Sequence, residues 1–203
     1  MPWLMASVYD RVMAGSEDVC LRGWRSELFA DLQGRVLEVG AGTGASIPCY
    51  PAAVSELVLA EPDPHMRRRL QARIDERCRV VAAPIEALGV DDESFDAIVS
   101  SLVLCSVESP AIALRELHRV LRPGGQLLFI EHVAAWDNPG RLRWQHRVEP
   151  VWKRFAGNCH LTRDTERSIR EAGFEIEQLE RDTVRKVVPL VRPSIRGRAR
   201  KPA

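Results

Sequence analysis

Apolar runs of strand length alternate with stretches of helical period along most of this chain of 203 residues. The run "RVLEVG" (35–40) comes first, and "ELVLAE" (56–61) follows it after a turn-rich segment. Because strands that alternate with amphipathic helices form a mostly parallel sheet with helices on both faces, the pattern predicts a doubly wound α/β fold. A chain of this length buries a sizeable core, so we expect residues 1–203 to form a single domain.

The later apolar runs complete the expected sheet. The fourth run is apolar throughout, which predicts a central position. Pro189 and Pro193 predict a turn before the last strand, which we therefore expect to run antiparallel to the others. The prediction is a seven-stranded, mostly parallel sheet, with the remaining strands in "RVVAA" (79–83), "SFDAIVSSLVLCSV" (94–107), "QLLFIEHV" (126–133), "FEIEQLE" (174–180) and "SIRGRAR" (194–200).

Between the strands, periodicity predicts helices over 64–77, 110–121 and 163–172, with "RPGG" (122–125) ending the second. The segment 136–160 breaks the alternation and is rich in Trp, Arg and His. Ligands of such sheets bind beyond the carboxyl ends of the strands. Because the segment follows the fifth strand, we expect it to be an insertion that covers the carboxyl ends of the strands, where a second substrate would bind.

The charge balance excludes a strongly basic protein, since 29 Lys and Arg stand against 28 Asp and Glu, for a net charge of +1. From Arg181 onward, however, eight basic residues stand against Asp182 alone. A solvated strand face accounts for this tail, so no nucleic-acid partner is expected. Peripheral contact with anionic lipid is an alternative that no residue supports.

The five cysteines are scattered and contain no C-x-x-C pair. This pattern differs from a disulfide framework or a zinc site, and it is typical of a reducing compartment. We therefore expect a cytoplasmic protein with no bound metal. The N-terminal segment "MPWLMASVYDRVMAG" is too short and too interrupted for a signal peptide or a membrane span.

The first strand runs into a glycine-rich turn, "GAGTGA" (40–45), which lets a ligand approach the backbone closely. The turn fits the dinucleotide pattern G-x-G-x-x-A, and Glu61 lies where an acid would accept hydrogen bonds from ribose hydroxyls. Both NAD and another adenosyl ligand satisfy this pattern. Glu38 favours the second, because a carboxylate two residues before the first glycine suits a sulfonium and an ammonium group better than a diphosphate.

In order and spacing, "LEVGAGTG", "AEPD", "SFDAIV" and "LRPGG" resemble the class I S-adenosylmethionine-dependent methyltransferases, which share a Rossmann-like sheet. The segments "SLVLCSVESP", "IEHV", "VEPVWK" and "NCHLTRDTE" are similar to the animal thiol S-methyltransferases of this class. By this comparison we also expect no N-terminal hydrophobic anchor of the kind found in that group. More distant relatives are quinone C-methyltransferases and phospholipid or amine N-methyltransferases.

The resemblance implies S-adenosylmethionine as cofactor and S-adenosylhomocysteine as product. It also implies that residues 1–32 form a helical lid over the cofactor, with Tyr9 and Asp10 within it. Pro62 and Asp63 are expected to turn the chain and cap the next helix. The implied cofactor site consists of Tyr9, Glu38, Gly40, Ala41, Gly42, Gly44, Glu61, Pro62, Ile85, Glu86, Ser101 and Leu102.

Methyl transfer needs alignment and exclusion of water rather than a covalent intermediate, although a thiol acceptor must lose its proton. His132, at the end of the fifth strand, is the first candidate for a catalytic group, followed by His160 and Arg163. Trp144, Trp152 and Phe155 either form an apolar acceptor pocket or anchor the inserted segment to the core. The hypothesis is methylation of a small, fairly apolar acceptor such as a thiol. A nicotinamide oxidoreductase and a non-catalytic binding module are the less favoured alternatives.

Overall fold

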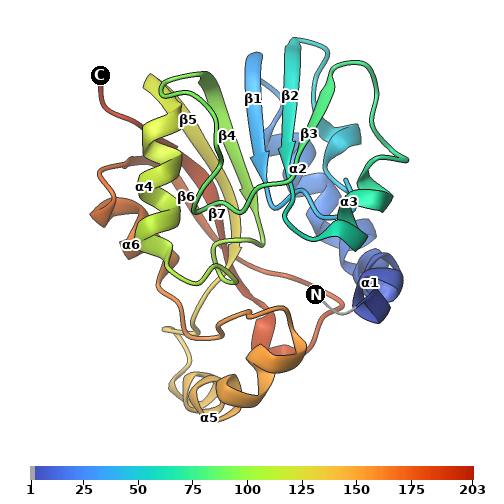
Figure 1. The fold of residues 1–203 in the computed structure, drawn as a ribbon. Helices are drawn as coiled ribbons and strands as arrows, with labels where there is room; N and C mark the ends of the chain where they lie inside the picture. Colours follow the sequence, from blue (N-terminus) through green and yellow to red (C-terminus); the bar gives the residue numbers. More distant parts are fainter. Residues whose placement is uncertain (1–2) are drawn as a thin grey trace.

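The computed structural model describes residues 3–203, with side chains from Asp10 onward, as a seven-stranded sheet flanked by helices (Figure 1). The strand order is β3-β2-β1-β4-β5-β7-β6, and β7 runs antiparallel to both of its neighbours. The predicted doubly wound, mostly parallel Rossmann-like sheet with an antiparallel last strand is confirmed. The strands are β1 (Gly34–Val39), β2 (Val54–Ala60), β3 (Cys78–Val81), β4 (Phe95–Ser101), β5 (Leu121–His132), β6 (Glu175–Thr183) and β7 (Pro193–Arg200).

Helices cover both faces of the sheet and divide its core in two. In β1, Leu37 and Val39 pack against α4 and α6, whereas Val36 packs on the opposite face against η1, α2 and α3. A central parallel strand is buried on both sides, which is why consecutive residues in the middle of β1 (36–37) and of β4 (97–99) are apolar. The helices are α1 (Trp3–Ser16), α2 (Arg22–Leu28), α3 (Pro64–Leu70), α4 (Pro110–Val120), α5 (Pro139–Phe155) and α6 (Thr165–Glu171), with short turns η1 (Glu17–Leu21), η2 (Ile47–Cys49) and η3 (Pro189–Val191).

Two predicted boundaries were wrong. The helix expected over 64–77 ends at Leu70, and Asp75 accepts a hydrogen bond from the backbone N–H of Arg77 at 3.0 Å. Such a local side-chain bond offers the backbone an alternative to the helix. The helix expected over 110–121 ends at Val120, next to its predicted end, but the fifth strand begins at Leu121 instead of Gln126. The "RPGG" segment (122–125) lies inside β5 as a bulge, because Leu121 pairs with Phe95 and the next pair is Gln126 with Ala97.

The insertion and α1 lie at the end of the sheet where ligands of this fold bind. Helix α5 follows β5 and lies beyond the carboxyl ends of the parallel strands (Figure 1). The N-terminal segment forms α1, the π-helical turn η1 and α2, and α1 lies beside α3. The glycine loop after β1 therefore opens between these two groups of helices.

The basic C-terminal strand is neutralised by carboxylates. Arg196 pairs with Glu27 and Glu180, each within 2.7 Å, and Arg198 pairs with Asp31 at 2.5 Å. These acids come from the N-terminal region and from β6, so the arginines connect elements that are distant in sequence. In β7 these two arginines are therefore paired and largely buried.

Candidate active site

Three glycines shape the loop after β1, and all three have positive φ. A Cβ at Gly40 would lie 2.5 Å from a methyl of Val103, and one at Gly44 would lie 2.8 Å from Ile47. Packing therefore requires both of these glycines. At Gly42 the nearest atom to an added Cβ would be the Gly40 carbonyl oxygen at 3.9 Å. The backbone at Gly42 consequently faces open space, where a ligand can reach it.

Glu61 follows β2 and reaches across to this loop. One carboxylate oxygen accepts a hydrogen bond from the N–H of Gly42 and the other from the N–H of Asp63, each at 2.8 Å. Burial raises the pKa of Glu61, and the two backbone N–H groups oppose that rise. A carboxylate has about four acceptor positions, so lone pairs are left for ribose hydroxyls. Glu61 can thus hold the glycine loop and bind a nucleoside at the same time.

Glu38 lies beneath the loop, with only 2% of its surface exposed. Tyr50 donates a hydrogen bond to its carboxylate at 3.0 Å. Burial raises the pKa of Glu38, while Ser46, Arg25 and Tyr50 act in the opposite direction. The carboxylate is therefore held inside the molecule by partners that the sequence motif did not reveal. Its contact with the cofactor stays a prediction.

Asp10 ties the N-terminal helix to the glycine loop. Thr43 donates a hydrogen bond to one Asp10 oxygen at 2.5 Å, and Arg73 donates to the other at 2.6 Å. We call these three residues the Asp10 clasp. Sequence analysis placed Asp10 in the lid, but nothing in the pattern pointed to Arg73. The side chain of Tyr9, which lies in α1, is outside the described part of the structure.

The residues expected at the adenine side lie in two environments. Ile85 is buried in the core, and Glu86 accepts a hydrogen bond from the N–H of Glu108 at 3.1 Å. Glu86 therefore supports the loop that follows β4.

Pro62 is exposed, and Asp63 caps α3 as predicted by accepting hydrogen bonds from the N–H groups of His65 and Met66.

The end of β4 is held tightly. Ser101 accepts a hydrogen bond from the Arg25 side chain at 3.2 Å, and the N–H of Leu102 donates to the Ile130 carbonyl at 2.7 Å. Leu102 has φ +61, which is uncommon for a residue with a side chain. On the other side of the loop, Ala41 is buried and donates from its N–H to the Ala60 carbonyl. The structure thus places Leu102 and Ala41 at the carboxyl ends of adjacent strands.

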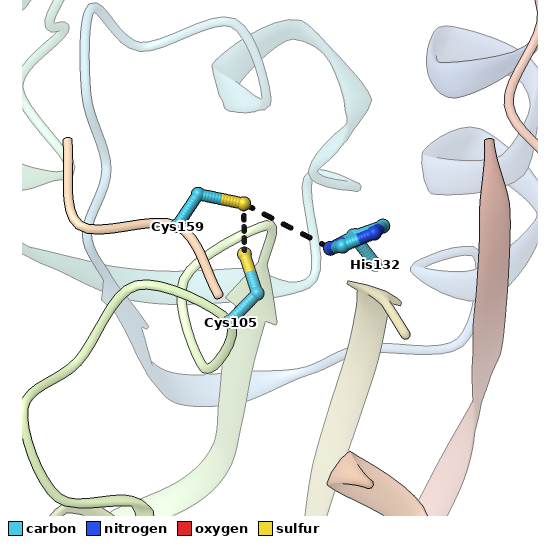
Figure 2. A group of neighbouring side chains, drawn as sticks. All are labelled: Cys105, His132 and Cys159. Atoms are coloured by element: carbon cyan, nitrogen blue, oxygen red, sulfur yellow. Dashed lines mark hydrogen bonds between the residues drawn. The ribbon is translucent and has the colours of Figure 1, made fainter. Parts of the chain in front are cut away.

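His132 ends β5 and lies beside two cysteines (Figure 2). Its Nδ1 is 3.8 Å from Cys159 Sγ, and Cys159 Sγ is 3.9 Å from Cys105 Sγ. The pKa of Cys159 is lowered, first by the hydrogen bond with Cys105 and further by Trp152 beside it. Cys105 and Cys159 are 54 residues apart, so their spacing gave no sign of this group.

His160 and Arg163 lie in the segment that follows α5. His160 Nδ1 is 3.5 Å from a Glu149 oxygen, and burial together with the Arg163 cation lowers the pKa of His160. The Arg163 guanidinium donates to the carbonyls of Leu104 and Val107. Arg163 therefore fixes the loop after β4, which makes it a positioning residue in this geometry.

Of the three aromatic residues expected on the acceptor side, Trp152 is half-buried and the other two are exposed. Trp144 is 57% exposed and Phe155 is 71% exposed. Helix α5 is anchored by the buried Gln145 instead, which bonds to Ala135 N–H and to the carbonyls of Val133 and Leu190. Anchoring by an apolar aromatic face, one of the two readings of these residues, is therefore wrong for Trp144 and Phe155.

Comparisons with known proteins agree with this geometry. Residues 37–129 match the family described as "Methyltransferase domain". The human thiol S-methyltransferase TMT1B is 36% identical over 212 residues, which cover 98% of this chain and 84% of that protein. The rat TMT1B is 37% identical over 88% of this chain and 77% of its own length. The chain belongs to this methyltransferase family.

This methyltransferase also shares its fold with solved structures of low identity. The [4+2]-cyclase SpnF superposes with a TM-score of 0.73 at 20% identity, over 90% of this chain and 80% of SpnF. S-adenosylmethionine fits the residues present, because the Gly42 backbone is open and Glu61 keeps free acceptor positions beside it. Within residues 3–203, no helix of the methyltransferase is long and apolar enough to cross a membrane.

Proposed function

We propose that this methyltransferase transfers the methyl group of S-adenosylmethionine to the sulfur of a small, fairly apolar thiol. The observation that carries the proposal is the likeness to the thiol S-methyltransferases. The match to the human protein covers 98% of this chain, and thus also the acceptor-side segment 136–160. A quinone carbon and an amine nitrogen are the alternative acceptors. The free cysteines support a cytoplasmic location.

The glycine loop and Glu61 would bind the donor, while the Asp10 clasp would hold α1 against it. Methyl transfer from a sulfonium is an in-line displacement, and holding the reacting atoms in line contributes up to about 7–11 kcal/mol. The new carbon–sulfur bond forms as the sulfonium bond breaks, and its electron pair stays on the departing S-adenosylhomocysteine. The main task of the protein is therefore alignment.

A thiol acceptor must also lose its proton, because the thiolate is the nucleophile. His160 is suited to accept it, since its lowered pKa leaves the ring neutral near pH 7. His132, buried at the end of β5, is the alternative base. Arg163 would keep the loop 104–107 in place around the acceptor.

Incubation of the full chain with a labelled methyl donor and a panel of thiols, quinones and amines tests the proposal. We expect label in the thioether product of an apolar thiol. Methylation of only quinones or only amines would overturn the acceptor assignment. Calorimetric titration with S-adenosylmethionine serves as the control, because a protein that does not bind the donor cannot act on any member of the panel.

A further inference from the structure

Cys105, His132 and Cys159 come from separate elements and meet beyond the carboxyl ends of β4 and β5 (Figure 2). Their potential ligand atoms all lie within 4.8 Å of one another, and the two closest pairs are 3.9 and 3.8 Å apart. Tetrahedral zinc at its usual bond lengths places sulfur and nitrogen ligands about 3.6–3.8 Å apart. The group therefore has nearly the dimensions of a three-ligand metal site.

His132 presents the ring nitrogen that a metal requires. Its Nε2 lies 3.4 Å from the Leu190 carbonyl oxygen, which can only accept a hydrogen bond. This contact favours the ring with its proton on Nε2, so the lone pair is on Nδ1, the atom next to Cys159. Metal-binding histidines are commonly oriented by such a bond from the second nitrogen to a backbone carbonyl.

The two cysteine-bearing segments are fixed to each other by bonds that do not involve the thiols. The N–H of His160 donates to the Cys105 carbonyl at 2.8 Å, and the Asn158 amide donates to the Ser106 carbonyl at 2.9 Å. The N–H of Cys105 also reaches a carboxylate oxygen of the buried Glu131 at 3.4 Å. The sulfur atoms are therefore held together by the backbone, as in a preformed site.

One side of the group is left for another ligand. Cys159 is partly exposed, and the indole of Trp152 lies beside its sulfur. Two thiolates and one imidazole with a fourth position open is also a donor set of catalytic zinc sites.

We propose that Cys105, His132 and Cys159 bind a soft divalent cation such as Zn²⁺, and that the acceptor thiol occupies the fourth position as a thiolate. This inference rests on the proposed function. With the metal bound, the acceptor thiol loses its proton to solvent rather than to His160 or His132, and its sulfur then attacks the donor methyl carbon. The sulfonium bond breaks as the new bond forms, and the neutral thioether product leaves because it is a weaker ligand than a thiolate.

Cobalt(II) is the probe, since it replaces zinc and gives a thiolate-to-metal absorption band. The full chain, reduced and stripped of metal, is titrated with Co²⁺, and then phenylmethanethiol is added. We expect one Co²⁺ per chain and a band that grows by about half when the third sulfur binds. The band should fall to about half in Cys159→Ser and vanish in the Cys105→Ser/Cys159→Ser double variant.

Cys78→Ser is the matched control, because Cys78 lies on β3 away from the group, and its band should equal that of the wild type. Absence of stoichiometric Co²⁺ binding, or an equal band in the double variant, would overturn the metal site. A band unchanged by phenylmethanethiol would overturn the proposal that a thiolate occupies the fourth position on the metal. Thiol methylation that continues in metal-free protein would reject this inference while leaving the proposed function intact.

Discussion

The carboxylate of Glu61 accepts hydrogen bonds from the backbone N–H groups of Gly42 and Asp63, and it borders the open face of the glycine loop. Glu61→Ala should weaken binding of S-adenosylhomocysteine by about 1–3 kcal/mol, because bonds to the ribose and to the loop are lost together. Isothermal titration calorimetry measures the change. Glu56→Ala removes a partly exposed ion pair between β2 and Arg35 of β1, and it should leave the affinity unchanged. Equal affinities in both variants would show that Glu61 does not contact the cofactor.

Single residues differ in how far the sequence predicts them. The glycines and Glu61 belong to one short segment whose spacing fixes their relation, so the motif predicted the loop correctly. Tyr50 beside Glu38, and Cys105 beside Cys159, depend on how distant segments pack. No local pattern contains that information, and only the fold brings these side chains together.

At the scale of elements, Glu149 connects α5 to the segment after it by accepting bonds from the N–H and hydroxyl of Thr162 at 2.8 and 2.7 Å. Burial alone raises its pKa, but these bonds and His160 lower it below its ordinary value near 4.5. A carboxyl whose pKa falls on folding stabilises the protein above the pKa of the unfolded chain, and this stabilisation is lost as pH falls through the folded pKa.

Glu149→Gln should therefore lower the free energy of unfolding by about 1 kcal/mol near neutral pH, a value reduced for partial exposure to solvent. At pH values below the lowered pKa of the folded protein, the difference from the wild type should disappear. Urea titrations at several pH values measure it. A difference that persists in acid would mean that the charge of Glu149 is not its source.

The Asp10 clasp gives a prediction for α1. Asp10→Ala leaves the buried Thr43 hydroxyl without its acceptor, so amide hydrogen exchange in α1 should accelerate roughly tenfold. Asp18→Ala removes an exposed pair with Arg22 in the following turn and should leave α1 protected as before. If both variants exchange at the same rate, the clasp does not hold the helix.

At the scale of the whole molecule, the cofactor that this protein binds should raise its melting temperature. A ligand at a hundred times its dissociation constant stabilises the folded state by about 2.7 kcal/mol, which raises Tm by about 5–10 °C in a chain of this size. We expect this shift with S-adenosylhomocysteine and none with NAD in a thermal melt. Stabilisation by NAD alone would mean that the glycine loop binds a dinucleotide instead of S-adenosylmethionine.

The architecture of the whole sheet was predictable because its signals are repeated along the chain. Alternating runs predicted seven strands, and the two prolines predicted the reversal before β7. The end of α3 was not predictable in this way, since Asp75 and Arg77 there compete with an otherwise helical pattern. Repeated, redundant patterns set the topology, whereas single local bonds decide where elements stop.

The last strand of the chain lies in the interior of the sheet, between β5 and β6. During synthesis, β6 leaves the ribosome before β7 exists, and it has no neighbour to pair with until the C-terminal residues emerge. The arginines of β7, which join acids from the first helices to those of β6, are likewise translated after these partners. The sheet can therefore close only once β7 has emerged, and a chain that stops before β7 would leave β5 and β6 without the strand that joins them.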